Sequence, residues 1–511
     1  MLGSSACRLL AALVPLLLAA AVPAAAAPDA SWPPAPYSQQ RLDWQPCRPD
    51  LPDLLCAMMT VPVDWDRPTA GDDLRIAVSL IPARDPAHRR GALFTNPGGP
   101  GQPGRFYPLL WYLSKPGIAA VYDVVGMDPR GTGLSGSIAC NPQRPDLPGD
   151  LRVRSPATLD ALRSRALVGA AACVDPARGL ARYMNTHETV RDMDLLRALL
   201  AEPKISYFGT SAGSWLGAWY ASEFPQRVDR FVFDSVVDFG RSWYDWQLLQ
   251  PAAVQRKFEA DFLPWLARYD GIYHYGATAR QAEATWEARR EALAASPLVL
   301  SPTCTVRPTE LEQMTWTGVI NGPRGGDGFV GLARTLSILE RLDSASPDER
   351  RYVEQHVVCM ASPDPTAGAA GPLAQESIVC GDTAPPSYAQ YEKDSERLGR
   401  EYPLFGWWHE VRNGFCAFWP FPATGAPRID GRGLPPMLMV NNQDDPVTPL
   451  EGALHAASRF PSARLLVVRN ESQHTIYGQG NACVDGYVDA FLLTGALPPE
   501  AATCEGFPLP G

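Results

Sequence analysis

Long basic runs are absent from this 511-residue sequence, and its formal net charge is −10. Binding to nucleic acid requires clustered Lys and Arg side chains against the phosphates, so we expect no nucleic-acid partner. The cysteines form no CxxC pair, which excludes the common zinc sites, and no GxxxxGK[ST] motif occurs, which excludes a P-loop. We expect neither a metal nor a cofactor. The 51 prolines follow no period, so they indicate a loop-rich globular chain and not a fibrous one.

After the N-terminus, no stretch reaches the roughly 20 apolar residues that a membrane-spanning helix needs. The N-terminus itself has Arg8, then an almost wholly apolar run over residues 9–22, then small residues. This order is typical of a secretory signal, here residues 1–27. A membrane anchor is the alternative, and Pro15 and the shortness of the run argue against it. We expect a secreted protein with no stable membrane insertion once the signal is cleaved.

The cysteine content agrees with export. Ten cysteines remain after Cys7, which lies in the signal, and they are scattered along the chain. In an exported chain this is typical of disulfides, although buried free thiols are the alternative. Pairing each cysteine with its neighbour predicts bonds 47–56, 140–173, 304–359, 380–416 and 483–504.

Short apolar runs followed by turn residues recur along the chain. They lie at 74–81, 92–95, 121–127, 205–208, 230–233, 437–440 and 465–468. Several are continuous, as expected of parallel strands covered on both faces. Helical periodicity separates some of them, for example at 188–200. This order predicts an α/β fold with a mostly parallel central sheet and helices on both faces.

The middle of the chain lacks this alternation. Between residues 240 and 434, charged helix-prone segments alternate with Gly- and Pro-rich segments, and the strand pattern returns at Pro435. We therefore predict one core in two parts, residues 28–239 and 435–511. They are separated by a large, mainly helical lid at 240–434.

Residues 209–213, GTSAG, form a G-x-S-x-G motif. The motif follows the predicted strand at 205–208 and precedes a predicted helix at 215–222, which is the context of a nucleophile elbow. On such a tight turn the hydroxyl of Ser211 projects at the edge of the sheet. Without that context the motif carries little weight, because G-x-S-x-G also arises by chance. We predict that Ser211 is a catalytic nucleophile.

A serine hydroxyl needs a base, and the chain has seven histidines. In enzymes with this elbow the chain order is Ser, acid, His. Only His474 follows a late predicted strand, at 465–468, and we predict it as the general base; an ordinary surface histidine is the alternative. Other histidines are expected near a helix start, in a helical stretch or in the lid: His187, His455, and His274, His356 and His409, respectively.

The acid should follow the preceding strand, at 437–440. The loop after that strand contains Asp444 and Asp445, and either carboxylate could orient the imidazole and stabilise its charged form. Thr448 could hydrogen-bond Asp445, whereas a helix-capping role fits Asp444 better.

Two glycine-containing turns follow early strands. Residues 96–101, NPGGPG, can lend a backbone N–H to an oxyanion, and the N–H of Ala212 would be the second donor. A plain tight turn is the alternative. Residues 128–133, DPRGTG, are interpreted as a structural loop that Arg130 holds in place.

Together these motifs resemble the secreted tripeptidyl-aminopeptidase-like branch of the α/β-hydrolases, which is related to the prolyl aminopeptidases. The matching pieces stand in order at 96–101, 128–133, 209–213, 445–449 and 474, followed by a matching C-terminal part with Cys483 and Cys504. One motif alone is weak, whereas five in the same order over about residues 40–504 are specific. The resemblance implies an α/β-hydrolase fold and favours Asp445 as the acid of a triad with Ser211 and His474. It also implies Gly99 and Ala212 as the oxyanion donors.

The resemblance further implies removal of short peptides or single residues from free N-termini, so peptides are the expected substrates. Such an enzyme needs a carboxylate for the α-ammonium of the substrate, because a charge-assisted hydrogen bond fixes its register. The resemblance points to Asp382, with Glu410 as a weaker candidate; for each, an ordinary solvated or helix-capping acid is the alternative.

The chain also departs from the family pattern. The family usually has an aromatic residue where this chain has Ala212, and glycines where it has Gln473 and Thr475. The triad survives these changes, but the expected substrate preference depends on positions that border the cleft.

Three functions fit these features to different degrees. A serine exopeptidase is favoured, a carboxylesterase or lipase-like hydrolase would use the same triad, and the complete Ser, Asp, His set argues against an inactive binding protein. Charges in the lid favour polar substrates modestly: Glu283, Glu287, Arg289, Glu291, Asp348 and Glu349. No pattern predicts the oligomeric state.

Overall fold

The computed structural model describes residues 32–69, 71–136, 146–174, 179–302, 304–324, 328–357 and 372–509. Within them a ten-stranded sheet has the order β1-β2-β3-β5-β4-β6-β7-β10-β11-β12. The strands are β1 (Gln45–Pro46), β2 (Leu55–Pro62), β3 (Asp73–Ile81), β4 (Ala92–Asn96), β5 (Asp123–Met127), β6 (Ile205–Thr210), β7 (Val228–Asp234), β10 (Met437–Asn442), β11 (Ala463–Arg469) and β12 (Thr503–Glu505).

All pairs from β5 through β12 are parallel, whereas β1, β2 and β3 join antiparallel at one edge. Every residue of β4, β6 and β10 is buried, as a parallel sheet covered on both faces requires. The predicted α/β fold with a mostly parallel sheet is confirmed. Of the ten strands, β1, β2 and β12 were not predicted.

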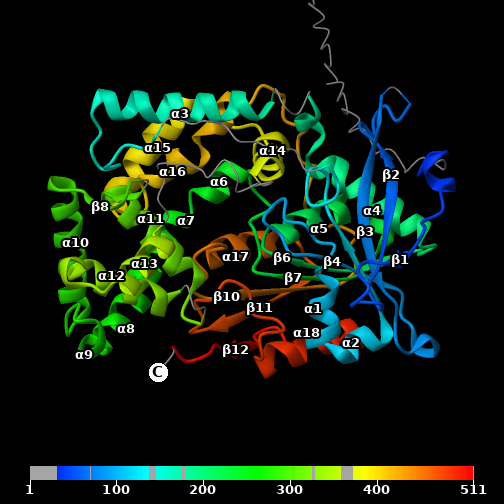
Figure 1. The fold of residues 1–511 in the computed structure, drawn as a ribbon. Coiled ribbons are helices and arrows are strands. Elements are labelled where there is room, and N and C mark those ends of the chain that lie inside the picture. The colour runs from blue at the N-terminus through cyan, green and yellow to red at the C-terminus, as the bar shows by residue number, and fades with distance from the viewer. Residues whose placement is uncertain are drawn as a thin grey trace, which may run out of the picture.

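Helices cover both faces of the sheet (Figure 1). One face carries α4 (Thr186–Leu199), α5 (Ala212–Glu223) and α17 (Leu450–Arg459), and the other carries α1 (Pro108–Ser114), α2 (Pro116–Val121) and α18 (Ala482–Thr494). The strand predicted at 121–127 starts two residues later, because Val121 ends α2. Each face has its own hydrophobic cluster, with Trp215 in one and Trp111 in the other.

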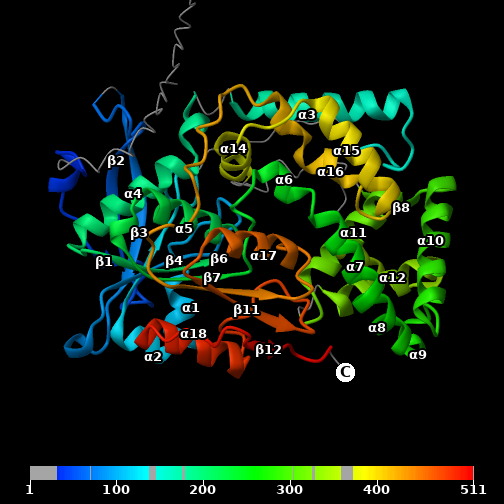
Figure 2. The same cartoon turned by 180° about the vertical axis from the view of Figure 1, so that it is seen from behind.

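Between β7 and β10 the described elements are mainly helical, and this part of the chain, for which the sequence predicts a lid at 240–434, is called the cap below. Its elements are α6 (Trp243–Gln247), α7 (Gln250–Lys257), the π-helical turn η5 (Phe258–Phe262), α8 (Leu263–Arg268), α9 (Asp270–Tyr273), α10 (Ala279–Ala295), hairpin β8 (Leu298–Ser301) and β9 (Cys304–Val306), α11 (Pro308–Asn321), α12 (Phe329–Glu340), α13 (Pro347–His356), α14 (Pro372–Asp382), α15 (Tyr388–Glu401) and α16 (Trp408–Asn413). Helices α7 to α13 form a block at one side of the sheet with their own core around Phe258, Trp286 and Leu311 (Figure 2).

Helix α3 (Pro156–Val174) belongs to the first half of the chain but lies along α15 and α16 of the cap (Figure 1). Leu147, Leu151 and Leu162 pack against Trp407 and Trp408. The segment before β6 therefore contributes to the layer above the sheet, which the strand pattern alone did not predict.

Three of the predicted disulfides are present: Cys47–Cys56, Cys380–Cys416 and Cys483–Cys504. The predicted pairs 140–173 and 304–359 each include a residue outside the described part of the chain. The predicted signal at 1–27 lies wholly outside it. Among the helices that are described, none is long and apolar enough to cross a membrane.

Candidate active site

Ser211 occupies the turn between β6 and α5 with φ +56° and ψ −125°. A non-glycine residue rarely adopts this conformation, and its occurrence between a strand and a helix is the mark of a nucleophile elbow. The flanking glycines are sterically required. A Cβ on Gly209 would lie 2.4 Å from the Gly213 carbonyl oxygen, and a Cβ on Gly213 would lie 2.8 Å from that of Asn96.

Hydrogen bonds to both backbone groups of Ser211 hold this strained turn. The Ser211 N–H donates to the Asp234 carbonyl oxygen at 2.8 Å, and the Ser214 hydroxyl donates to the Ser211 carbonyl oxygen at 2.6 Å. Ser211 is 9% exposed, so it is largely buried but keeps some solvent-accessible surface.

Asp445 and His474 form a hydrogen-bonded pair. His474 Nδ1 lies 2.9 Å from Asp445 Oδ2 and 3.1 Å from Oδ1. The Val447 N–H, the Thr448 N–H and the Thr448 hydroxyl also donate to this carboxylate, at 2.8, 2.9 and 2.8 Å. Burial opposes ionisation, but His474 and the Thr448 donors outweigh it and lower the pKa of Asp445. The site therefore holds an ionised carboxylate against the imidazole.

The neighbouring Asp444 makes no hydrogen bond to His474 in the described part of the chain. Its N–H donates to the Glu471 carbonyl oxygen at 2.9 Å, and burial, with the negative charge of Asp261, raises its pKa. Of the two aspartates that the sequence left open, the structure brings Asp445 to His474.

The three residues follow strands that end at one edge of the sheet. Thr210, Asp234 and Val440 are lateral neighbours on parallel strands β6, β7 and β10. Ser211 directly follows β6, Asp445 follows β10, and His474 follows β11. The carboxyl edge of an open parallel sheet is where ligands and catalytic groups gather.

Two residues at the end of β7, Asp234 and Ser235, were missed by sequence reasoning. The Ser235 hydroxyl donates to Asp445 Oδ2 at 2.8 Å and accepts the Thr475 N–H at 2.8 Å. Asp234 Oδ2 accepts the N–H groups of Ile476 and Tyr477 at 3.0 Å each. The signal that could have found them is their place: Asp234 is the last residue of β7 and Ser235 the next, so both are polar residues at the end of a buried apolar run.

The glycine-rich turn lies against the elbow. A Cβ on Gly98 would lie 2.3 Å from the Thr210 carbonyl oxygen, so only glycine fits there, and its φ of +89° also favours glycine. In the described residues, neither the Gly99 N–H nor the Ala212 N–H donates to a protein acceptor. Two backbone donors are thus left available on the two segments that meet beside Ser211.

A narrow pocket opens beside Ala212. Its walls come from the glycine-rich turn, from Thr186 and Trp215 at the starts of α4 and α5, and from Ile378 of α14. The walls are mainly apolar, and the pocket borders the turn that carries the predicted nucleophile.

Asp382 lies behind this pocket and not in it. It is 0% exposed, and its carboxylate accepts from the Thr186 N–H (2.8 Å), the Thr186 hydroxyl (2.6 Å), Trp215 Nε1 (3.0 Å) and Trp243 Nε1 (3.2 Å). Burial raises its pKa to about 6. The prediction that Asp382 receives the α-ammonium of a substrate is not supported, because protein donors occupy its lone pairs; it supports the pocket wall instead.

Glu410 is also buried and occupied. Its carboxylate pairs with Arg154 Nη2 at 2.7 Å and accepts from the Tyr388 hydroxyl. It ties the segment before α3 to α15 and α16. The prediction of a substrate-binding role for Glu410 is not supported either, for the same physical reason.

Arg130 has the structural role that we expected. It is 1% exposed, and its Nε and Nη2 pair with the two oxygens of Asp192. Nη2 also donates to the Pro62 carbonyl oxygen, and Nη1 donates to that of Val63. It joins the 128–133 loop to α4 and to the end of β2, and no part of it is open to a substrate.

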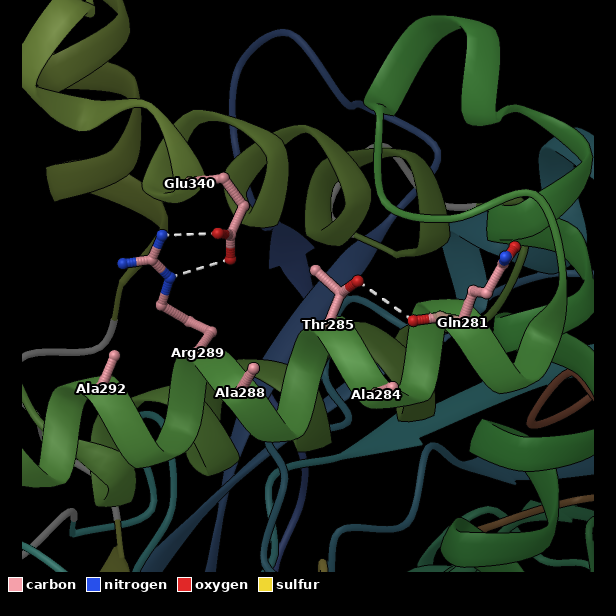
Figure 3. A pocket seen from close by; sticks show the side chains of 7 residues that line it. All are labelled: Gln281, Ala284, Thr285, Ala288, Arg289, Ala292 and Glu340. Atoms are coloured by element: carbon pink, nitrogen blue, oxygen red, sulfur yellow. Dashed lines mark hydrogen bonds and ion pairs between the residues drawn. The ribbon is translucent and has the colours of Figure 1, made fainter.

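The charged lid residues that suggested polar substrates lie away from Ser211. Arg289 and Glu340 form an ion pair in a shallow groove of about 520 Å³ along the outer face of α10, next to exposed alanines (Figure 3). Glu283, Glu291 and Asp348 are exposed. Their charge therefore gives no information about substrate polarity.

Comparisons with known proteins cover nearly the whole chain. Family models match at residues 91–304, described as alpha/beta hydrolase fold, and at 402–504, described as TAP-like protein. The chain is 34% identical to a tripeptidyl aminopeptidase of Streptomyces coelicolor, over 91% of this chain and 86% of that protein. It is 30% identical to the serine protease Hip1 of Mycobacterium tuberculosis, over 92% of each chain. It is also 30% identical to carboxylesterase B of Mycobacterium tuberculosis, over 92% of this chain and 91% of that protein.

Proposed function

The chain belongs to the tripeptidyl-aminopeptidase family of α/β-hydrolase serine hydrolases, and we propose that it is a secreted exopeptidase that releases short peptides from free N-termini. In this proposal Ser211 is the nucleophile, His474 the general base and Asp445 the acid. The observation that carries it is the Asp445–His474 hydrogen bond, at the sheet edge where the strained Ser211 turn also lies.

The chemistry follows from these positions. Ser211 Oγ attacks the carbonyl carbon of the scissile bond while His474 takes the hydroxyl proton. The N–H groups of Gly99 and Ala212 stabilise the resulting oxyanion. The C–N bond then breaks, His474 gives its proton to the leaving amine, and an acyl-enzyme remains. Water attacks the acyl-enzyme with His474 again as base, and Ser211 regains its proton.

A triad does not by itself count residues from an N-terminus. The cap covers the carboxyl edge of the sheet and supplies α14, which meets the glycine-rich turn at Gly101, where a Cβ would lie 2.8 Å from the Gln375 nitrogen. We infer that a cap in this place restricts the length of substrate on the acyl side, and this inference favours an exopeptidase over an endopeptidase. Neither Asp382 nor Glu410 is retained as the ammonium partner.

The experiment compares fluorogenic tripeptide amides that differ only in whether their N-terminus is free or acetylated. We expect hydrolysis of the free peptides and loss of hydrolysis on acetylation, with Ser211→Ala as the inactive control. Efficient cleavage of the acetylated peptides would reject the exopeptidase and leave a serine endopeptidase.

A carboxylesterase is the second candidate. The similarity to carboxylesterase B favours it, because that relative is as similar to this chain as Hip1 is. A kcat/KM for short-chain esters that exceeds the best peptide value by orders of magnitude would support it over the peptidase.

Secretion is supported by the segment at 1–27 and by three described disulfides, which persist in oxidising compartments. Expression of the full-length chain in a secreting host, followed by N-terminal sequencing of the protein from the medium, tests it. A first residue near Ala27 is expected, and retention of the whole protein in the cells would contradict it.

A further inference from the structure

The loop that carries His474 is held by the cap. We propose that Lys257, the last residue of α7, is a positioning residue for the general base: it fixes this loop and balances the charge around the Asp445–His474 pair. The inference rests on the triad proposed above.

Lys257 lies where a helix changes its geometry. Helix α7 ends at Lys257, and the π-helical turn η5 follows directly. Such turns are rare and occur frequently at functional sites. The Lys257 side chain is 1% exposed, and its ammonium donates a hydrogen bond to the Ser472 carbonyl oxygen, two residues before His474.

Neighbouring loop residues also meet the cap. Arg324 Nη1 and Nη2 each lie 3.2 Å from Glu471 Oε2, and Gln473 Nε2 donates to the Asn321 carbonyl oxygen at 3.3 Å. Residues 471, 472 and 473 are therefore each contacted by a cap residue. The loop of the proposed general base is therefore supported by cap residues that lie far from His474 in the sequence.

The charge of Lys257 is surrounded by charged groups on every packed segment. It faces Asp261 of η5, Asp445 after β10, Glu471 after β11 and Arg324 after α11, and it also acts on Asp444. Burial lowers the pKa of Lys257 to about 8, against the pull of Asp445, Asp261 and Glu471. A buried ammonium is costly unless carboxylates and hydrogen bonds compensate it, so its presence here calls for a role that an apolar side chain could not fill.

The charge has a direct consequence for the base. His474 becomes an imidazolium during each proton transfer, and nearby negative charge favours that form while positive charge opposes it. Removal of Lys257 takes away a positive charge that faces Asp445 and Asp261, whereas Glu471 keeps its pairing with Arg324. The remaining negative charge makes the imidazolium easier to form. The acid limb of the activity profile, where a histidine base becomes protonated, then moves to higher pH.

The test uses the full-length mature enzyme and three variants at this site. Lys257→Met removes the donor and the charge, Lys257→Gln keeps a donor without the charge, and Asp261→Asn removes a facing negative charge. Arg256→Met is the matched control, because Arg256 is the preceding residue but is half exposed and pairs with Glu451. For each protein, kcat, KM and the rate of fluorophosphonate labelling are measured against pH.

We expect kcat of Lys257→Met to fall ~10- to 100-fold with KM nearly unchanged, because the base is misplaced and not the substrate. Lys257→Gln should recover part of kcat. Both variants should move the acid limb upward by about half a pH unit or more, Asp261→Asn should move it downward, and Arg256→Met should leave it in place.

An unchanged acid limb in Lys257→Met and Lys257→Gln would overturn the charge role, and unchanged kcat in both would overturn the positioning role. If Lys257→Met does not fold, Lys257→Gln decides alone. Labelling that persists in Ser211→Ala would instead show that the triad itself is misassigned, so the two failures are distinguishable.

Discussion

The hydroxyl of Ser235 donates a hydrogen bond to Asp445 Oδ2 at 2.8 Å, across 210 residues of sequence. Ser235 holds this place with a positive φ of 60° and is fully buried. Its oxygen also accepts the Thr475 N–H, next to His474. One hydroxyl thus joins the loop of the acid to the loop of the base.

Ser235→Ala should therefore lower kcat ~10-fold or more while KM changes little. The variant leaves the half-buried Thr475 N–H without its acceptor and removes one donor from the buried Asp445 carboxylate. An unsatisfied buried group costs about 1–3 kcal/mol. Steady-state kinetics with a free tripeptide amide measure this effect. The control is Ser222→Ala, whose hydroxyl donates to the Ala218 carbonyl oxygen within α5, and this variant should be neutral. Equal kinetics for the two variants would contradict the role of Ser235.

Ser211 and His474 should behave as one unit. Ser211→Ala and His474→Ala should each remove nearly all activity, and the double variant should lose little more, because either change alone abolishes proton-coupled attack. Single-turnover assays of the three proteins measure the effect, and a fluorophosphonate should label only chains that retain Ser211. Losses that multiply in the double variant would show that the two residues act independently.

Substitutions of the two adjacent aspartates, Asp444 and Asp445, should differ sharply in their effect on kcat. Asp445→Asn should fold normally but lower kcat by ~10⁴, because the imidazole loses the carboxylate that orients it and stabilises its charged form. Asp444→Asn should be mild, since Asp444 makes no hydrogen bond to His474 in the described residues. Kinetics of both variants, with circular dichroism to check folding, decide the assignment. The reverse ranking would mean that the acid is displaced by one residue.

Asp234 predicts a pH dependence of stability. Burial raises its pKa from 3.8 to about 6, and its Oδ1 has no hydrogen-bond partner among the described residues. The carboxyl group of Asp234 therefore binds a proton more tightly in the folded state than in the unfolded state. Its stabilising contribution is complete below pH 3.8 and is lost as pH rises through about 6.

The matching experiment compares urea unfolding of the wild type and Asp234→Asn between about pH 4 and about pH 7. The free energy of unfolding of the wild type relative to the variant should fall by about 2 kcal/mol over this range as pH rises, because the amide of the variant does not ionise. A difference between the two proteins that stays constant with pH would reject the raised pKa.

Elements that depend on local pattern were predicted well. The runs at 205–208 and 437–440 lie within β6 and β10, because a continuous apolar run can be buried only where both faces are covered. The elbow was predictable because its constraint spans five residues, with glycines two positions on either side of Ser211. The helix predicted at 188–200 agrees with α4 to within a few residues.

Roles that depend on burial were predicted less well. Asp382 and Glu410 were interpreted from their position in the sequence, but the energy of a carboxylate depends on which donors surround it. For Asp382 these are Thr186, Trp215 and Trp243, at least 139 residues away along the chain. No residue near Asp382 in the sequence indicates that these donors will surround it.

The sequence by itself determined the α/β class, the chain order of the proposed nucleophile, acid and base, and the mainly helical character of the middle of the chain, because periodicity and turn residues are local properties. Only the tertiary structure decided that Asp445 and not Asp444 meets His474, that Ser235 and Asp234 join the loops at the sheet edge, and that Lys257 of the cap reaches the His474 loop. These contacts join residues that lie close only after the parallel strands have aligned their carboxyl ends. Their strength comes from desolvation at that edge, which no stretch of sequence carries alone.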